Sequence, residues 1–228
     1  MKELLFAPEF NFYKIMLIFV AGGVLGDLAE TVFCYLKYKK WMCRSSFVYC
    51  QLSAVWGLGF VAASVLAYKM TGYHITVVFA AGAILGSAVE YACSFVLEKV
   101  FGVTFWDYSK FKYNIEGRVN LLYSLYWGIA GVLWINHIFP AVSELLDQIP
   151  VSVLVPLGEG LFILLSVDSF MSIVALKRYG ERKKGIEADD RIRVLIDRHF
   201  TDERLERIYP HMKMSAERTV DKCECVDY

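Results

Sequence analysis

The stretch ITVVFAAGAILGSAVEYACSFVL, residues 75–97, carries a single charged residue, Glu90, and is otherwise apolar or weakly polar. At about 1.5 Å per residue, a helix of this length crosses the roughly 30 Å of hydrocarbon in a bilayer. Similar apolar runs lie at residues 12–36, 47–68, 119–139 and 151–176. The sequence therefore predicts an all-α protein, a polytopic membrane helix bundle with five transmembrane helices.

The overall composition agrees with this class. The chain has 228 residues, 57% of them hydrophobic, and a mean hydropathy of +0.43. Short charged clusters separate the apolar runs, whereas a soluble protein would alternate apolar and charged faces along each helix. The formal net charge is zero, which gives no electrostatic reason to expect a nucleic-acid partner. The partner we expect is the lipid bilayer.

Basic residues gather on alternate connections between the apolar runs. Residues 37–46, residues 98–118 and the chain from Lys177 onward are rich in Lys and Arg, whereas residues 140–150 contain none. Cytoplasmic loops of membrane proteins carry such an excess of positive charge. We therefore expect the N-terminus outside and the C-terminus in the cytoplasm.

Two segments of the chain resemble each other. AGGVLGDLAETVFCYL (21–36) aligns without gaps on AGAILGSAVEYACSFV (81–96), and each is followed by a basic loop and a span containing Trp-Gly. This pattern predicts an internal repeat of two helical hairpins with the same topology, 12–68 and 75–139. With the fifth span, 151–176, they form a transmembrane domain over 1–178, and 179–228 is a small cytoplasmic helical tail.

Glycines recur at a spacing of four within the repeat, at Gly22, Gly26, Gly82 and Gly86. Small residues at this spacing let two helix backbones approach closely in lipid. We expect these glycines to pack the two halves together, so that the first and third spans are neighbours.

Five acidic residues fall inside the spans, and three of them, Glu30, Glu90 and Asp168, lie at about the same depth. Asp27 and Glu159 lie farther toward the outer side. A carboxylate in a bilayer is costly unless it is paired, hydrated or protonated. Arg44 and Arg118 begin the returning spans and are suited to pair with Glu30 and Glu90. Two interpretations stand: symmetric salt bridges that fix each hairpin, or an acid-lined cavity that binds a cation, a proton or a polar substrate group. Asp168 has no obvious basic partner, which favours the functional interpretation for it.

The connection FWDYSKFKYNIEGR (105–118) is too charged for lipid and too aromatic for an idle linker. Its aromatic rings suit the headgroup layer, and its Asp, Ser, Asn and Gly suit tight turns. It is interpreted as an ordered re-entry turn, or as a cytoplasmic gate or docking surface for a partner. The residues of this loop motif are Trp106, Asp107, Tyr108, Ser109, Asn114 and Gly117.

Three segments together resemble the family of type IV ABC-transporter permeases, small polytopic membrane proteins of bacteria. They are the loop motif with the following Trp127-Gly128, the segment RSSFVYCQLSAVWGLG (44–59) and the tail segment LIDRHFTDERLERIYPHMK (195–213). The resemblance covers nearly all of the chain, including Glu90 and Asp168. It implies a transport permease in the bacterial cytoplasmic membrane, served by an ATPase.

The resemblance also shapes expectations about partners and backbone. The sequence has no GxxxxGK[ST] loop, so the ATPase would be a separate ATP-binding subunit. Five spans are few for a complete transport pathway, so we expect a homo-oligomer. Where the family commonly has Gly-Pro and a further Pro in the second span, this chain has Cys50-Gln51 and Ala54, and we expect a straighter second span.

Two other functions remain alternatives: a membrane-embedded lipid-handling enzyme, and a regulatory or scaffold protein acting through its tail. The sequence offers no nucleophile–base pair or phosphate loop, so we expect no catalytic residues and no cofactor. In the tail, residues 186–199 and a segment capped by Thr201 predict two short helices. Cys223, Cys225 and His211 are too few and too terminal to predict a metal site.

Overall fold

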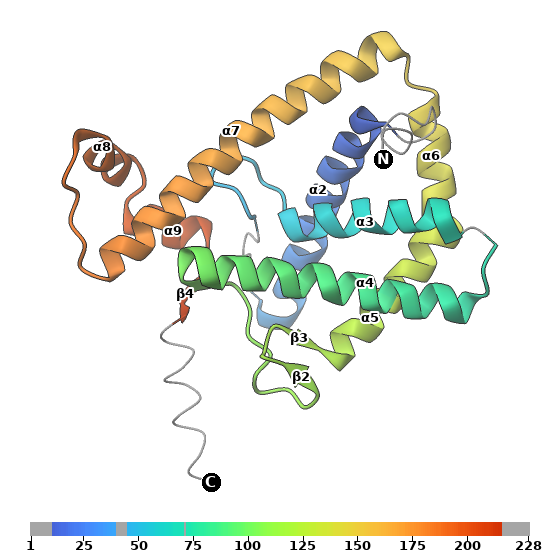
Figure 1. Ribbon diagram of the computed structural model, residues 1–228, viewed down its shortest axis with the longest axis horizontal. Helices are drawn as coiled ribbons and strands as arrows, with labels where there is room; N and C mark the ends of the chain where they lie inside the picture. The colour runs from blue at the N-terminus through green and yellow to red at the C-terminus, as the bar shows by residue number, and fades with distance from the viewer. Residues whose placement is uncertain (1–10, 40–44, 71, 216–228) are drawn as a thin grey trace.

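The computed structural model describes residues 11–39, 45–70 and 72–215 and is helical through most of this range (Figure 1). The long elements are α2 (Phe12–Tyr38), α3 (Ala54–Met70), α4 (Ile75–Val96), α5 (Leu121–Leu133), α6 (Phe139–Asp147) and α7 (Val151–Lys183). Two π-helical turns, η1 (Leu97–Phe101) and η2 (Trp134–Ile138), extend α4 and join α5 to α6. The remaining elements are α8 (Arg191–His199), α9 (Asp202–Ile208) and four two-residue strands, β1 (Val103–Thr104), β2 (Asn114–Ile115), β3 (Val119–Asn120) and β4 (Lys213–Met214).

Four helical stretches among the described residues are long and apolar enough to cross a membrane: Phe12–Leu36, Ile75–Phe101, Leu121–Asp147 and Val151–Lys183. The prediction of a helical membrane bundle is therefore confirmed. The boundaries differ from those expected, because the stretch that begins at Leu121 continues through Pro140 to Asp147 and α7 continues past the expected boundary at residue 178.

The expected second span, residues 47–68, is not one continuous helix. Helix α3 begins only at Ala54 and has 17 residues, which is about 25 Å of helix. Residues 45–53 before it form no helix or strand. The expectation of a straighter second span is therefore wrong: the backbone is irregular here although the chain has no proline at these positions.

In the first hairpin, α2 and α3 approach closely because glycines face aromatic rings. A Cβ atom added to Gly26 would lie 2.1 Å from Trp56 Cγ, and one added to Gly22 would lie 2.6 Å from Phe60 Cβ. From the opposite helix, a Cβ on Gly57 would lie 2.8 Å from Phe19 Cε2. These side chains occupy the space that only a glycine leaves free.

The second hairpin, α4 with α5, repeats these contacts at matching positions. A Cβ on Gly86 would lie 2.4 Å from Trp127 Cγ, and one on Gly128 would lie 2.7 Å from Phe79 Cε2. A Cβ added to Gly82 would lie 3.2 Å from the Cα of Gly131, so the two helix backbones are in direct contact at this point. Each glycine pair thus packs its own hairpin, and the expectation that the glycines join the two halves is wrong.

The two hairpins meet through α3, which packs against α4 and η2. The buried residues at this junction are Ile18, Ala67, Val78, Trp134 and Ile135. The first and third spans are therefore separated by α3 rather than packed as principal neighbours. Helix α7 runs alongside α2 and closes the bundle on one side (Figure 1).

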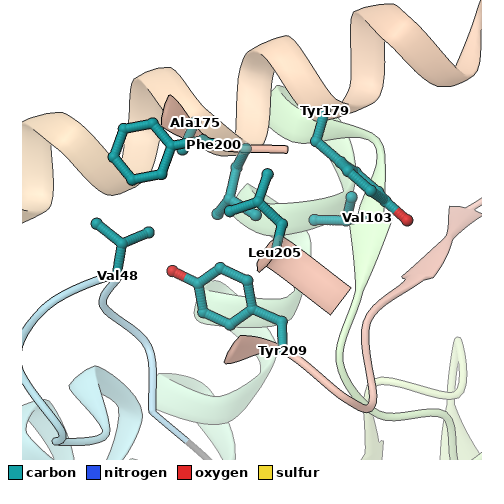
Figure 2. Packing of buried hydrophobic residues seen from close by; sticks show 8 residues of the cluster. Val48, Val103, Ala175, Tyr179, Phe200, Leu205 and Tyr209 are labelled. Carbon is teal, nitrogen blue, oxygen red and sulfur yellow. The ribbon is translucent and has the colours of Figure 1, made fainter. Parts of the chain in front are cut away.

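The chain after α7 folds back onto the ends of both hairpins. Phe200, Leu205 and Tyr209 from the tail pack with Val48 and Val103 against the end of α7, as Figure 2 shows. In addition, β4 pairs antiparallel with β1, which follows directly after the extended α4. The expected tail helices are present as α8 and α9, and the Thr201 side chain caps α9 as predicted.

Replacing Gly86 by Ala is expected to destabilise the second hairpin by about 1–3 kcal/mol, because the new methyl group would overlap the Trp127 ring. Thermal unfolding of the purified protein in detergent measures the loss. Gly160→Ala on α7 is the matched control, since no atom lies within 4 Å of a Cβ added there. Equal stability of Gly86→Ala and the wild-type chain would contradict this packing.

Candidate functional site

Glu30 lies one helical turn after Gly26, on the same face of α2. Residues four apart in a helix share a face, so the indole that lies over Gly26 also reaches the acid. Trp56 Nε1 donates a hydrogen bond of 2.7 Å to Glu30 Oε1. The glycine therefore makes room for the ring, and the acid accepts its N–H.

Glu90 has the same arrangement in the second hairpin and is more deeply buried, with 7% of its surface exposed. Trp127, which lies over Gly86, donates from Nε1 to Glu90 Oε2 at 3.2 Å. The hydroxyl of Tyr108, in the connection between α4 and α5, donates to Glu90 Oε1 at 2.8 Å. Both carboxylate oxygens of Glu90 thus accept hydrogen bonds from neutral donors.

The two acid–indole pairs meet at the junction between the hairpins. The ring centroids of Trp56 and Trp127 lie 5.0 Å apart, with the ring planes 44° from each other. Burial raises the pKa of the Tyr108 phenol, and the negative charges of Glu90 and Glu30 raise it further. The phenol therefore stays protonated and keeps donating to Glu90 throughout the physiological pH range.

Arg118 does not pair with Glu90, and this expectation is wrong. Its guanidinium, 4% exposed, lies 2.8 Å from Glu98 and 3.1 Å from Glu116. Glu98 lies eight residues beyond Glu90, about 12 Å further along the helix, and so faces the arginine at the end of the hairpin. The hydrogen bond from Arg118 lowers the pKa of Glu116. Arg44, the expected partner of Glu30, lies outside the described residues.

The loop motif forms an ordered turn, as one of the two interpretations held. Asp107 accepts from the backbone N–H and the hydroxyl of Ser109. Asn114 accepts a hydrogen bond from Gly117 N at 2.8 Å. Gly117 has a positive φ of 64°, a turn conformation that a glycine at this position predicts. Trp106 Nε1 donates to the carbonyl of Arg118 and so closes the loop across its base.

Asp168, in the middle of α7, accepts hydrogen bonds from backbone groups and a hydroxyl, and no cation binds it within the described residues. Its two oxygens accept from Tyr49 N at 3.2 Å and from Cys50 N at 2.6 Å. One turn further along α7, the Ser172 hydroxyl accepts from Val48 N at 3.0 Å. Only 2% of the Asp168 surface is exposed.

These contacts explain how residues 45–53 remain non-helical beside the apolar helices. Irregular backbone at membrane depth requires protein partners for its N–H and C=O groups. Asp168 and Ser172 provide acceptors on one side, and the Ser45 hydroxyl donates to Cys50 O at 2.7 Å within the segment. On the other side, the hydroxyl of Tyr209 in the tail donates to Ser46 O at 3.3 Å.

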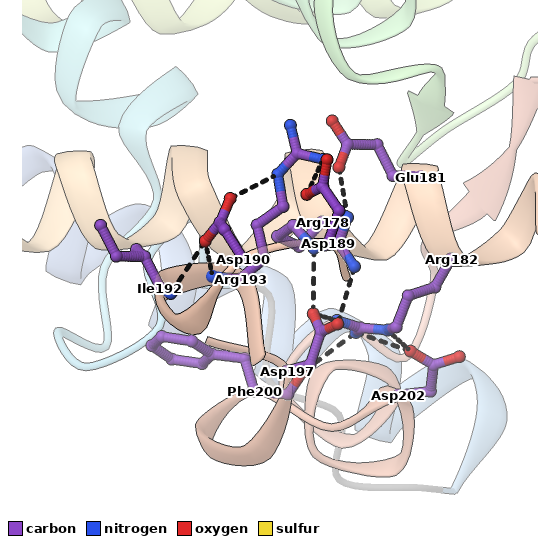
Figure 3. A network of polar contacts seen from close by, with 10 residues as sticks. All are labelled: Arg178, Glu181, Arg182, Asp189, Asp190, Ile192, Arg193, Asp197, Phe200 and Asp202. Carbon is purple, nitrogen blue, oxygen red and sulfur yellow. Dashed lines mark hydrogen bonds and ion pairs between the residues drawn. The ribbon is translucent and has the colours of Figure 1, made fainter. Parts of the chain in front are cut away.

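The tail is fixed to α7 by a network of ion pairs, shown in Figure 3. Asp197 on α8 accepts from Arg178 at 2.7 Å and also pairs with Arg182. Arg182 in turn pairs with Asp202 on α9 at 2.6 Å. The hydrogen bonds from Arg178 lower the pKa of Asp197. Through Tyr209 and this network, the position of residues 45–53 is linked to α8 and α9.

The described residues contain no group of three or more His, Cys, Asp or Glu side chains suited to hold a metal ion. Cys223 and Cys225, the weak candidates in the tail, lie outside the described residues.

A comparison with protein families now adds to this geometry. The model of a family described as "Putative ABC-transporter type IV" matches residues 17–173, which include most of the first hairpin, all of the second, and Glu30, Glu90 and Asp168. The chain belongs to this family. No curated protein and no solved structure gives a significant match. As a member of the ABC-transporter type IV family with several apolar helices, the chain is a multi-pass membrane protein.

Sequence reasoning located the acids of this type IV family member but missed their donors. Trp56 donates to Glu30, and Trp127 and Tyr108 donate to Glu90. One signal was present in the sequence, because the Trp-Gly pair recurs in both halves. The reach of Tyr108 from its loop to Glu90 had no such signal, since it depends on how the loop folds.

Asp168→Ala is expected to loosen residues 45–53, because the N–H groups of Tyr49 and Cys50 would lose their buried acceptor, at a cost of up to about 1–3 kcal/mol each. Cys50 reports this when it is the sole cysteine, and we expect its maleimide labelling to become several-fold faster. Glu159→Ala is the matched control, as Glu159 is an exposed acid on the same helix. Unchanged labelling in Asp168→Ala would contradict the role of Asp168 as the acceptor.

Asp197→Asn is expected to weaken docking of the tail at neutral pH, measured as lower hydrogen-exchange protection of α8 after correction for intrinsic rates. Because the folded-state pKa of Asp197 is lowered, its contribution is present above the unfolded pKa of about 3.9 and is lost as pH falls through the folded value. The wild-type chain should therefore lose the same protection only in acid. Asp189→Asn, at an exposed acid whose one ion-pair partner among the described residues is Arg193, should leave α8 unchanged at neutral pH. Equal loss of protection in both variants would contradict the assignment.

Proposed function

We propose that this chain is the permease subunit of an ABC transporter, working with a separate ATPase, and that it moves a small substrate along the junction between its two hairpins. The observation that carries the proposal is the hydrogen bond from Tyr108 to Glu90. It connects a loop at the surface of the bundle directly to an intramembrane acid. A partner that moves the loop would therefore change the surroundings of Glu90.

The packing supports movement between hairpins rather than within them. Inside each hairpin, glycines hold aromatic rings in close contact, and such tight interfaces move as units. Between the hairpins, α3 contacts α4 and η2 less extensively than the helices contact each other within a hairpin, and the acid–indole pairs meet there where the rings of Trp56 and Trp127 lie side by side. The matching contacts also support an internal repeat, with the two hairpins as the equivalent halves on either side of the junction.

The acids suit a role in contacting substrate. A carboxylate accepts about four hydrogen bonds, and Glu90 accepts two, both from neutral groups, among the described residues. Its negative charge is thus left to attract a proton or a cationic or hydrogen-bonding group of the substrate. Glu30, across the two indoles, supplies a second carboxylate at the same junction.

The remaining parts of the proposal concern assembly and orientation. We infer five membrane passes, with residues 45–53 completing the short second span, and a homo-oligomer that provides the full pathway. The distribution of basic residues supports an N-terminus outside and a C-terminus in the cytoplasm of a bacterial cell. The loop motif, the tail and the ATPase would then share the cytoplasmic side.

The test is gentle purification of the tagged protein from its native membrane, followed by measurement of ATP hydrolysis after transfer to nanodiscs. We expect a stoichiometric ATPase, whose turnover changes several-fold in Tyr108→Phe and in Glu90→Gln. Tyr113→Phe is the matched control, because Tyr113 lies in the same loop and is 78% exposed.

The outcomes separate the two parts of the proposal. A preparation without an ATPase would overturn the role as an ABC permease and favour an enzyme or a scaffold. An ATPase whose turnover is the same in all three variants would leave the assembly intact and overturn the role of Tyr108 and Glu90.

A further inference from the structure

Helix α8 presents apolar side chains that no other described part of the chain covers. Ile192 is 72% exposed and Leu195 is 67% exposed. Other parts of the chain hold the rest of α8: Asp197, on the side away from Ile192, binds Arg178 of α7, and Ile196, one turn after Ile192, packs on the cluster around Phe200. The outward face is thus apolar within a segment that is otherwise strongly charged.

The level of α8 along α7 is fixed by contacts. On the exposed side of α7, the apolar surface includes Phe170 (64% exposed) and Ile173 (47% exposed) and ends at the exposed Lys177. Asp197 binds Arg178, the next residue along α7. Helix α8 therefore lies where the lipid-exposed surface of α7 changes from apolar to charged, which is the level of the headgroups.

The direction of α8 matches a position along the membrane surface. In Figure 1, α7 lies in the plane of the picture while α8 is seen nearly end-on, so the two axes cross steeply. His199, two turns after Ile192 on the same side of α8, contacts the hydroxyl of Tyr49, whose backbone N–H binds Asp168. The Ile192 edge therefore faces the membrane interior rather than the cytoplasm.

Two cationic side chains border this apolar face. Arg191 and Arg198 are exposed and lie four residues before and three residues after Leu195, so all three share one row along the helix. Neither arginine forms an ion pair within the described residues. Guanidinium groups bind phosphate oxygens through paired hydrogen bonds, and anionic lipids attract basic residues close to the inner leaflet.

We propose that α8 lies in the headgroup layer of the inner leaflet, with Ile192 and Leu195 inserted among the acyl chains and Arg191 and Arg198 on the phosphates of anionic lipids. An amphipathic helix with this arrangement sits about 5–10 Å into the boundary between headgroups and acyl chains. His199 of α8 contacts the Tyr49 hydroxyl, and Tyr209, which follows α9, donates to Ser46 O. A lipid surface that holds α8 would therefore also hold residues 45–53 in place. The inference needs α7 to span the membrane but does not depend on transport.

The test uses the full-length protein with its native cysteines replaced by serine, and a nitroxide spin label at Ile192→Cys, Leu195→Cys or Val194→Cys. Val194 is the matched control, because it lies on the other edge of the same helix. The protein is reconstituted in bilayers of phosphatidylethanolamine with phosphatidylglycerol, and collisions of each label with oxygen and with a water-soluble nickel chelate are measured. We expect a ratio of oxygen to nickel collisions several-fold higher at Ile192 and Leu195 than at Val194. The charge-reversed pair Arg191→Glu and Arg198→Glu should abolish this difference.

Three results would overturn the proposal. Equal, water-like ratios at all three labels would mean that α8 lies in the cytoplasm. Immobilised labels shielded from both probes would mean that a second copy or another protein covers the face. An unchanged pattern in the charge-reversed variant, or in pure phosphatidylcholine, would rule out binding of anionic headgroups. Retained thermal stability in detergent shows in each case that the variant is folded.

Discussion

Each hairpin depends on an indole ring that lies over a glycine and donates its N–H to a glutamate one helical turn away. In the first hairpin these residues are Gly26, Trp56 and Glu30. Without a side chain at the glycine, the two helices approach until the ring fills the space, and the acid then lies within reach of the ring nitrogen. One arrangement therefore supplies both the close packing of the hairpin and a hydrogen-bond partner for an acid that would be costly in lipid.

The irregular segment before α3, residues 45–53, is under the same constraint, because its backbone polar groups, like the buried acids, need hydrogen-bond partners within the protein. Its N–H groups have no helical partners, so acceptors must come from elsewhere in the protein. Asp168 and Ser172 supply them from α7, and Tyr209 meets a carbonyl from the other side. Since Tyr209 belongs to the tail, the tail is an integral part of the fold that joins α7 to the ends of both hairpins.

These two arrangements place the polar groups of the protein in a connected path. Loop residue Tyr108 binds Glu90, the Trp56–Trp127 contact links Glu90 to Glu30, and the tail holds the segment that precedes Trp56. The cationic side chains have a different role. Arg118, Arg178 and Arg182 pair with acids at the ends of the helices, so they fix the loop and tail. Within the described part of the chain, Glu90 and Asp168 accept hydrogen bonds from neutral donors instead.

The sequence by itself determined four of the five expected apolar spans, the matching glycines and acids of the two halves, the turn at Gly117 and the cap at Thr201. Each of these follows from local composition, from helical spacing or from backbone conformation, which a short stretch of chain specifies. Only the tertiary structure decided the partners. Charge alone favoured Arg118 for Glu90, but Arg118 pairs with Glu98, about 12 Å further along the extended α4, and Tyr108 reaches Glu90 from the folded loop. Likewise, the start of α3 at Ala54 depends on Asp168, more than a hundred residues away, because an apolar run is equally compatible with a helix and with backbone that distant acceptors hold irregular.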